Sequence, residues 1–228
     1  MGSSALRHKI LTPRTHLSWS QLQLLERSEA QYISKYIFHK EAFVSDRMDF
    51  GKQVAVGLEQ KSSGNPQIEA LRLLLPDCPR REFSVVAEFN EVPLIGIYDG
   101  YYPRPKLIID EYKTGENAWS QNRVDSHGQL MFYNLLHLAK YRTIAKQTRL
   151  HWAQTARDED GEWCLTGRLE TFVARITLDQ VLIFAAERVQ KGWDRILEIS
   201  AEYQNEIKQN NEHKQSTSGG KGNKRRRA

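Results

Sequence analysis

Cysteine is scarce in this chain: Cys78 and Cys164 are the only two among 228 residues. Two thiols are too few for a disulfide framework, for an iron–sulfur cluster held by cysteines alone, or for an all-cysteine zinc site. We therefore expect no iron–sulfur cluster. The same scarcity makes a reducing compartment, the cytoplasm, the expected location.

Long hydrophobic runs are also missing. No stretch approaches the ~20 apolar residues that cross a bilayer, and the N-terminus shows no signal-peptide pattern. Hydrophobic residues make up 39% of the chain and charged residues 27%, which are ordinary proportions for a globular protein. A chain of 228 residues is long enough for one domain with a substantial core. We therefore expect a globular protein without a membrane partner.

Excess charge is missing from the body of the chain, although the whole chain carries a net charge of +5. Residues 207–228 hold seven Lys and Arg and one acid, which leaves 26 basic residues (33 − 7) and 27 acidic ones (28 − 1), a net charge of −1. The end of this segment, QSTSGGKGNKRRRA, has no large apolar residue to bury and is expected to be disordered. A basic tail favours polyanions through counterion release, whereas a solubilising tail without a specific partner is the alternative. The candidate nucleic-acid contacts are Lys224, Arg225, Arg226 and Arg227.

Apolar periodicity predicts an alternation of helices and strands. Helices are expected at 17–38, 49–61, 66–74, 119–141 and from about Thr177 to Tyr203, and strands at 82–89, 92–99, 106–113 and 149–156. The first helix is expected to begin at Ser18 or Ser20, and the Asn90–Glu91 link is short enough for a hairpin. The order predicts an α/β fold in which helices cover a mixed sheet. We expect a flexible N-terminus at 1–16, one domain at 17–206 and a disordered tail at 207–228.

Two consecutive predicted strands end in charged residues. The second strand ends at Asp99, and the third delivers Glu111 and Lys113. Side chains alternate along a strand, so Glu111 and Lys113 share one face while Asp110 and Tyr112 point to the other. If the two strands pair across the turn between them, Asp99 lies beside Glu111.

Two neighbouring carboxylates repel each other unless a cation neutralises them. The usual solution is a hard divalent cation held by oxygen ligands. Lys113 would add a point charge suited to negative charge developing on a phosphate. The alternative is that these residues are solvated strand ends, which is common for charged side chains.

The long predicted helix carries a polar pair. Gln129 and Tyr133 are four residues apart and share a face, whereas Met131, Leu135 and Leu138 form a separate apolar stripe. The polar pair could look back over the strand ends. An ordinary interfacial pair is the alternative.

In combination, Asp99, Glu111-x-Lys113 and Gln129-x3-Tyr133 resemble the PD-(D/E)XK nuclease superfamily. The third strand reads IIDEYKTG, and within the superfamily this resembles the RecB-like exonuclease branch, where such a strand precedes a Q-x3-Y helix. The first predicted helix resembles the S-x-S helix of that branch, with Ser28 where a Cys often stands. The resemblance covers about residues 17–200. It implies a restriction-endonuclease-like core, αβββαβ, with extra N- and C-terminal helices.

The resemblance also implies a Mg²⁺- or Mn²⁺-dependent DNA nuclease, with exonuclease action expected. Asp99 and Glu111 would bind the metal together with the carbonyl of Tyr112, and the metal would activate a water. Lys113 would orient that water or neutralise charge. The catalytic set that the resemblance implies is Asp99, Glu111, Lys113, Gln129 and Tyr133.

One departure concerns a metal-binding His in the first core helix of the branch. The corresponding position is Ala55, so this ligand is missing. Glu59, one helical turn further on, and Glu88, at a strand end, are the candidate substitutes. Because this ligand is missing, an alternative is a chain that binds nucleic acid without cleaving it. Such a chain would be a nucleic-acid-binding subunit of a repair, recombination or defence complex.

Two residues between the third strand and the long helix are candidates for contact with the substrate strand. Trp119 could stack on bases and Arg123 could contact phosphate, although a packing role for Trp119 is the alternative. The expected partner is DNA, with a protein partner in a repair or recombination complex as a further possibility. A structural domain without activity is the remaining alternative.

Overall fold

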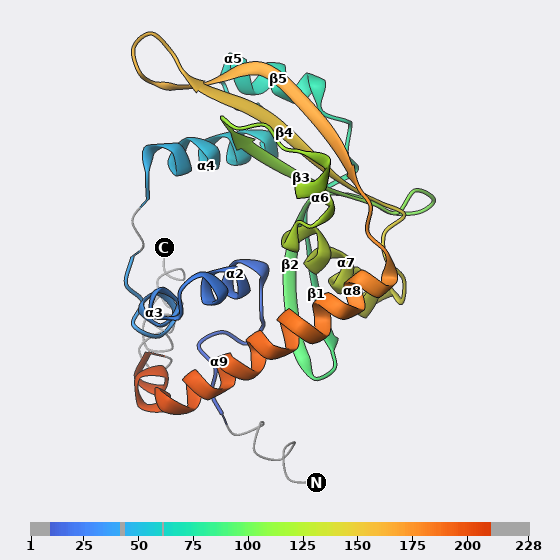
Figure 1. Ribbon diagram of the computed structural model, residues 1–228. Helices are drawn as coiled ribbons and strands as arrows, with labels where there is room; N and C mark the ends of the chain where they lie inside the picture. Colours follow the sequence, from blue (N-terminus) through green and yellow to red (C-terminus); the bar gives the residue numbers. More distant parts are fainter. Residues whose placement is uncertain (1–9, 42–43, 61, 211–228) are drawn as a thin grey trace, which may run out of the picture. The chain divides into compact units, whose positions relative to one another are not determined.

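The computed structural model describes residues 10–41, 44–60 and 62–210 (Figure 1). The chain divides into two compact units: one combines the segment up to Ala42 with the segment from Arg188, and the other is Phe43–Glu187. The range expected as one domain, 17–206, therefore contributes to both units. The expected contacts at Lys224–Arg227 lie outside the described residues.

A mixed five-stranded sheet forms the centre of the Phe43–Glu187 unit. Its strands are β1 (Arg80–Phe89), β2 (Val92–Tyr102), β3 (Ile108–Gly115), β4 (Gln147–Arg157) and β5 (Trp163–Ala174), and they lie side by side in this order. β3 and β4 are parallel, and the other neighbouring pairs are antiparallel. The predicted α/β class with a mixed sheet is confirmed.

The sequence pattern did not predict β5. It pairs with β4 from Thr148↔Ala174 to Arg157↔Trp163. Exposed Gly167 and Arg168 interrupt its apolar pattern, and Gly167 has a φ of +84°. Pairing with the buried strand β4, rather than its own pattern, makes this segment a strand.

The first hairpin has the two-residue turn that the sequence predicts. Asn90 and Glu91 have φ values of +48° and +63°, which suit a tight turn between twisted strands. The ladder starts at Phe89↔Val92 and continues in the same register to Arg80↔Tyr101. The turn therefore fixes which residues of β1 and β2 face each other.

Helices cover both faces of this sheet. In β4, Leu150 and Trp152 pack in a cluster with Val124 and Leu130 of helices α6 (Gln121–Asp125) and α7 (Gly128–Tyr141). Ala153 points to the other face, in a cluster with residues of α4 (Asp46–Glu59) and α5 (Pro66–Leu74). This alternation follows from the two-residue period of a strand.

The helix predicted at 119–141 is two helices. Ser120 caps α6, and the hydroxyl of Ser126 donates a hydrogen bond of 2.9 Å to the carbonyl of Asn122. Such a bond within one turn competes with the helical ladder. The chain therefore leaves helical geometry at Ser126 and resumes it after His127 as α7.

The other unit is helical in its described part. Ser18 caps α2 (Trp19–Arg27) as predicted, but the predicted helix 17–38 is interrupted at Ser28. This residue has an extended backbone (φ −165°), and its hydroxyl caps α3 (Glu29–Tyr32). The π-helical segment η1 (Ile33–Ile37) follows. In the same unit, Gly192 of α9 (Lys191–Glu202) lies against Leu22, where a larger residue would clash.

The last predicted helix begins as expected, and its last segment, α9, ends at Glu202, close to the expected end. Thr177 forms a capping box at α8 (Leu178–Phe184), and the π-helical segment η2 (Ala185–Gln190) leads into α9. Residues 207–210, assigned to the disordered tail, are helical, and Ile207 is buried. Among the described residues, no helix combines the length and apolar character needed to span a bilayer.

Candidate active site

Asp99 lies where β2 and β3 separate. The two strands pair from Tyr102↔Ile108 to Gly100↔Asp110, so Asp99 and Glu111 are the next opposing positions. Beyond that point the carboxylate of Asp99 accepts a hydrogen bond of 2.6 Å from the backbone N–H of Tyr112. The two carboxylates that the sequence pattern places together are therefore neighbours in the structure.

The electrostatic environment of Asp99 disfavours its negative charge. Burial and the nearby carboxylate of Glu111 raise the pKa of Asp99 well above its usual value. The hydrogen bond from Tyr112 and the charge of Lys113 lower this pKa, but they do not offset the increase. The protein alone therefore supplies too little positive charge at this position.

Replacing Asp99 with Asn should raise the melting temperature of the metal-free protein at neutral pH. A carboxyl whose pKa is raised by folding costs stability as the pH rises above its unfolded value of about 3.9. Asn carries no charge, and its oxygen can still accept the bond from Tyr112. We expect an increase of about 2–4 °C at about pH 7.5 that vanishes near pH 4. Thermal denaturation in EDTA measures it, and a decrease at neutral pH would mark Asp99 as structural.

Glu111, Lys113, Gln129 and Tyr133 form one chain of contacts. Lys113 makes an ion pair with Glu111, and its Nζ donates to Oε1 of Gln129 at 2.9 Å. The amide of Gln129 donates to the hydroxyl of Tyr133 at 2.8 Å, and that hydroxyl donates to the carbonyl of Ile97 at 2.6 Å. The polar face of α7 thus contacts the ends of the strands, as predicted.

The carboxylate of Glu111 is buried with one oxygen unpaired. Glu111 is 2% exposed, and its Oε2 has no hydrogen-bond partner within the described part of the chain. A buried anionic oxygen without a partner is costly. Together with Asp99 it makes this corner of the sheet a position where a cation would be stabilised.

Tyr133 remains a hydrogen-bond donor here. Burial, followed by the charges of Glu111 and Asp99, raises its pKa well above the usual value. A phenol in this state keeps its proton at neutral pH. Tyr133 therefore supports Gln129 and is unsuited to act as a base.

The residues proposed to replace the missing His lie in different places. Glu59, at the end of α4, lines a cavity of about 40 Å³ together with Ala55 and Asp99. Glu88 pairs with Pro93 near the hairpin turn, about 20 Å along β1 from the level of Asp99. Glu59 is thus brought to the site and Glu88 is not. Within the described residues, no three His, Cys, Asp or Glu side chains are gathered closely enough to form a metal site on their own.

Glu82 is a site residue that the sequence analysis missed. It lines the same cavity as Asp99, and partial burial and the carboxylates of Glu59 and Glu111 raise its pKa. The signal was present in the sequence, because counting outward from a two-residue turn at Asn90–Glu91 places residue 82 opposite residue 99.

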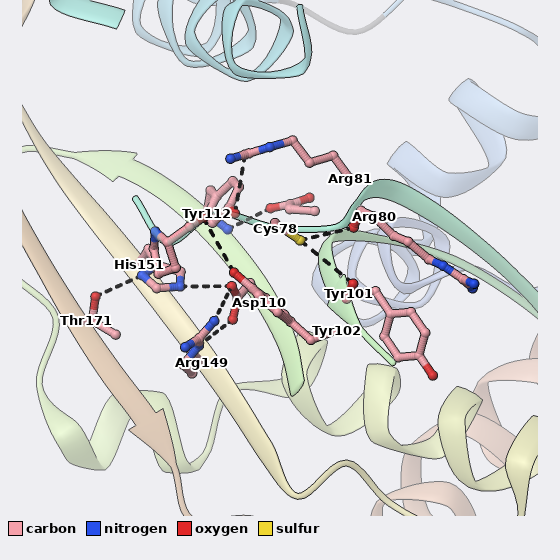
Figure 2. Close-up of polar contacts among 12 residues, drawn as sticks. Cys78, Arg80, Arg81, Tyr101, Tyr102, Asp110, Tyr112, Arg149, His151 and Thr171 are labelled. Atoms are coloured by element: carbon pink, nitrogen blue, oxygen red, sulfur yellow. Dashed lines mark hydrogen bonds and ion pairs between the residues drawn. The ribbon is translucent and has the colours of Figure 1, made fainter. Parts of the chain in front are cut away.

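A second missed feature is a buried charge network on the α4-facing side of the sheet. Figure 2 shows the carboxylate of Asp110 in β3 between Arg149 and His151 of β4. Arg149 donates two hydrogen bonds of 2.7 Å to Asp110, and Nε2 of His151 lies 3.3 Å from it. Burial alone would raise the pKa of Asp110, but the bonds from His151 and Arg149 outweigh burial and hold this pKa below its usual value. The network ties β3 to β4 directly behind Glu111.

Trp119 and Arg123 contact each other. The guanidinium carbon of Arg123 lies 3.8 Å from the centre of the Trp119 ring, and Trp119 is half-buried against the cluster around Val124. The ring of His127 meets Trp119 edge-on at 5.0 Å. Trp119 therefore packs within the protein, and the predicted contact with a substrate strand stays a prediction.

Comparison with known proteins adds a likeness at the level of the fold. No family model and no curated protein matches the chain. Among solved structures, it is similar to a protein from Eubacterium rectale named "Putative exonuclease", with a TM-score of 0.55, 14% sequence identity and 82% of each chain covered. A likeness at this identity concerns the fold and not the reaction. The mixed sheet with flanking helices is thus a fold that this chain shares with a nuclease-like neighbour.

Proposed function

We propose that this protein is a Mg²⁺- or Mn²⁺-dependent DNA nuclease of the PD-(D/E)XK type and the RecB-like branch, and that it acts as an exonuclease. The observation that carries the proposal is the continuous chain from Glu111 through Lys113 and Gln129 to Tyr133, with Asp99 beside it. These are the residues of the motif, and they meet at one corner of the sheet. The exonuclease name of the structural neighbour agrees with this proposal.

The residues present fit a divalent metal ion. Asp99 has a carboxyl whose pKa is raised by burial and by Glu111, and Glu111 has an unpaired buried oxygen, so both would gain from a cation. Asp99, Glu111 and the carbonyl of Tyr112 would hold the ion through oxygen, which Mg²⁺ and Mn²⁺ prefer. When bound, such an ion lowers the pKa of a water and offsets charge on the phosphate.

The other residues of the set would neutralise charge on the phosphate and hold one another in position. Lys113 is held from two sides, by Glu111 and by Gln129, so its ammonium has a fixed position next to the carboxylates. A fixed cation stabilises the negative charge that develops on a phosphate during hydrolysis. Tyr133 holds Gln129, and through it Lys113, in place.

A catalytically weak or inactive nucleic-acid-binding subunit is the second candidate. Ala55 supports it, because a methyl group stands where the branch has a metal-binding imidazole, and a cavity of about 40 Å³ lies beside it. The shortage of directly convergent metal ligands in the described residues also favours weaker metal binding. Both candidates predict an interaction with DNA.

A cleavage time course separates the two candidates. End-labelled single- and double-stranded DNA is incubated with the purified protein and Mg²⁺, Mn²⁺ or EDTA. Stepwise shortening that requires metal supports the proposed exonuclease, and internal fragments point to endonuclease action. Binding without metal-dependent cleavage supports the inactive subunit.

Deleting residues 211–228, which leaves the buried Ile207 in place, should weaken DNA binding more than it slows cleavage. The deletion removes six Lys and Arg and one Glu, a net charge of +5, and the remaining chain has 27 basic and 27 acidic residues and no net charge. Each phosphate that is no longer neutralised should flatten the dependence of log affinity on log salt by about 0.9 for duplex DNA. Binding titrations at several salt concentrations test this. An unchanged slope would show that the body holds the DNA, and a collapse of the saturated rate would place the tail in the active complex.

A further inference from the structure

Glu82 faces Asp99 across the first hairpin, and the role inferred for it below rests on the function proposed above. The ladder pairs Arg81 with Gly100 and Phe83 with Tyr98, which leaves Glu82 opposite Asp99. Glu82 and Asp99 also line the same cavity, so the two side chains lie near each other. The register and this shared cavity therefore bring a further carboxylate to the proposed metal position.

A cavity connects Glu82 with that position. It measures about 40 Å³ and is lined by Glu82, Asp99 and Glu59 among others. A buried water needs about 10–15 Å³ and two to four polar partners, so the space can hold water between these carboxylates. Glu82 and Glu59 are exposed, and neither makes a hydrogen bond or an ion pair with another described residue, so their oxygens are open to accept from water.

The backbone at Glu82 departs from regular strand geometry. Its φ is +47°, in the left-handed region that side chains other than Gly rarely occupy. The regular pairs Arg81↔Gly100 and Phe83↔Tyr98 on either side hold this conformation in place. Strained residues of this kind cluster at functional sites.

An independent observation points to a cation nearby. The Oε2 atom of Glu111 is buried and has no partner in the described part of the chain, and Glu111 is close enough to affect both Asp99 and Glu82. No three acidic side chains there converge as direct ligands. Because Mg²⁺ usually keeps several of its waters, a carboxylate one water away still contributes to binding.

We propose that Glu82 is a positioning residue of the metal site, which accepts hydrogen bonds from metal-bound water across the cavity next to Asp99. This role adds a carboxylate on β1 to the set on β2 and β3. It also supplies negative charge where Ala55 leaves the site without an imidazole ligand.

The test compares two carboxylates of one strand. Glu82→Gln should weaken Mn²⁺ binding to the DNA-free protein about 10-fold, measured by isothermal titration calorimetry. Glu88→Gln is the matched control, because Glu88 is also a Glu of β1 but lies at the hairpin end, and its affinity should equal that of the wild type. Glu82→Asp, which keeps the charge, should recover part of the loss.

Further outcomes separate the role of Glu82 from the proposed function. The melting temperature of Glu82→Gln in EDTA should match or exceed that of the wild type, because repulsion among carboxylates is relieved. If the wild type binds Mn²⁺ and Glu82→Gln binds it equally well, the role of Glu82 is wrong while the nuclease proposal stands. If the wild type binds no Mn²⁺, both are wrong.

Discussion

Lys113→Ala is expected to lower the saturated rate of metal-dependent DNA cleavage by about 100- to 1000-fold. The ammonium of Lys113 is fixed between Glu111 and Gln129, so it is oriented before a substrate arrives. A preoriented charge that acts on the transition state is worth about this much when it is removed. The measurement is the cleavage rate at saturating Mn²⁺ and DNA.

The stability of the same variant must also be measured, because Lys113 neutralises the negative charge of Glu111. Without the ammonium, Glu111 is a buried carboxylate without an ion-pair partner, and the metal-free protein should melt at a lower temperature. Saturating Mn²⁺ should restore part of this loss, since a cation then neutralises Glu111. Lys140→Ala, an exposed Lys on the same helix as Gln129, is the control and should cleave normally. Wild-type turnover by Lys113→Ala would remove Lys113 from the mechanism.

Arg149→Met is expected to cause a large loss of stability. Arg149 donates two hydrogen bonds to Asp110, which is fully buried. Removing one partner of a buried ion pair leaves the other charge uncompensated and lowers the free energy of unfolding by about 3–5 kcal/mol. Chemical denaturation at neutral pH measures the change in the free energy of unfolding.

Two further variants identify the buried charge as the cause. Asp110→Asn combined with Arg149→Met removes both charges, and this double variant should be more stable than Arg149→Met alone. Arg168→Met breaks the exposed pair with Glu170 on the same sheet and should cost less than about 1 kcal/mol. A double variant that is no more stable than Arg149→Met would attribute the loss to packing instead.

The pKa of Asp110 in the same network leads to a prediction about stability at low pH. The pKa of Asp110 is held below its usual value in the folded state, so this group stabilises the protein above the unfolded pKa of about 3.9. That contribution is lost as the pH falls through the lower folded value. Denaturation midpoints of the wild type should therefore fall below about pH 4 more steeply than those of the double variant.

Much of the candidate site could be predicted because its residues are connected by short-range rules. Asp99 and Glu111 flank one turn between two strands, and Gln129 and Tyr133 are four residues apart on one helix. In both cases a single turn or a single helix connects the two residues, so their spacing in the sequence determines their relative positions. Glu82 follows from the same kind of rule, since a two-residue turn at Asn90–Glu91 dictates the register.

The contacts of Asp110 could not be predicted in this way. β3 and β4 are parallel, and their register of Asp110↔Arg149 is set after a crossover through two helices. The length of a crossover does not specify which residues of two parallel strands pair. The side chains that neutralise Asp110 therefore become visible only when the strands are placed together.

The division of the chain into two units has a consequence for biosynthesis. The unit Phe43–Glu187 is one uninterrupted segment, so every residue of its sheet and covering helices has been made once Glu187 leaves the ribosome. The other unit needs α2 and α9, which stand at opposite ends of the sequence, and cannot assemble until α9 has been synthesised. During translation, Leu22 of α2 therefore lacks its contact with Gly192 of α9 while the central unit folds. The sheet that carries the candidate site thus has the opportunity to form before α2 can pack against α9.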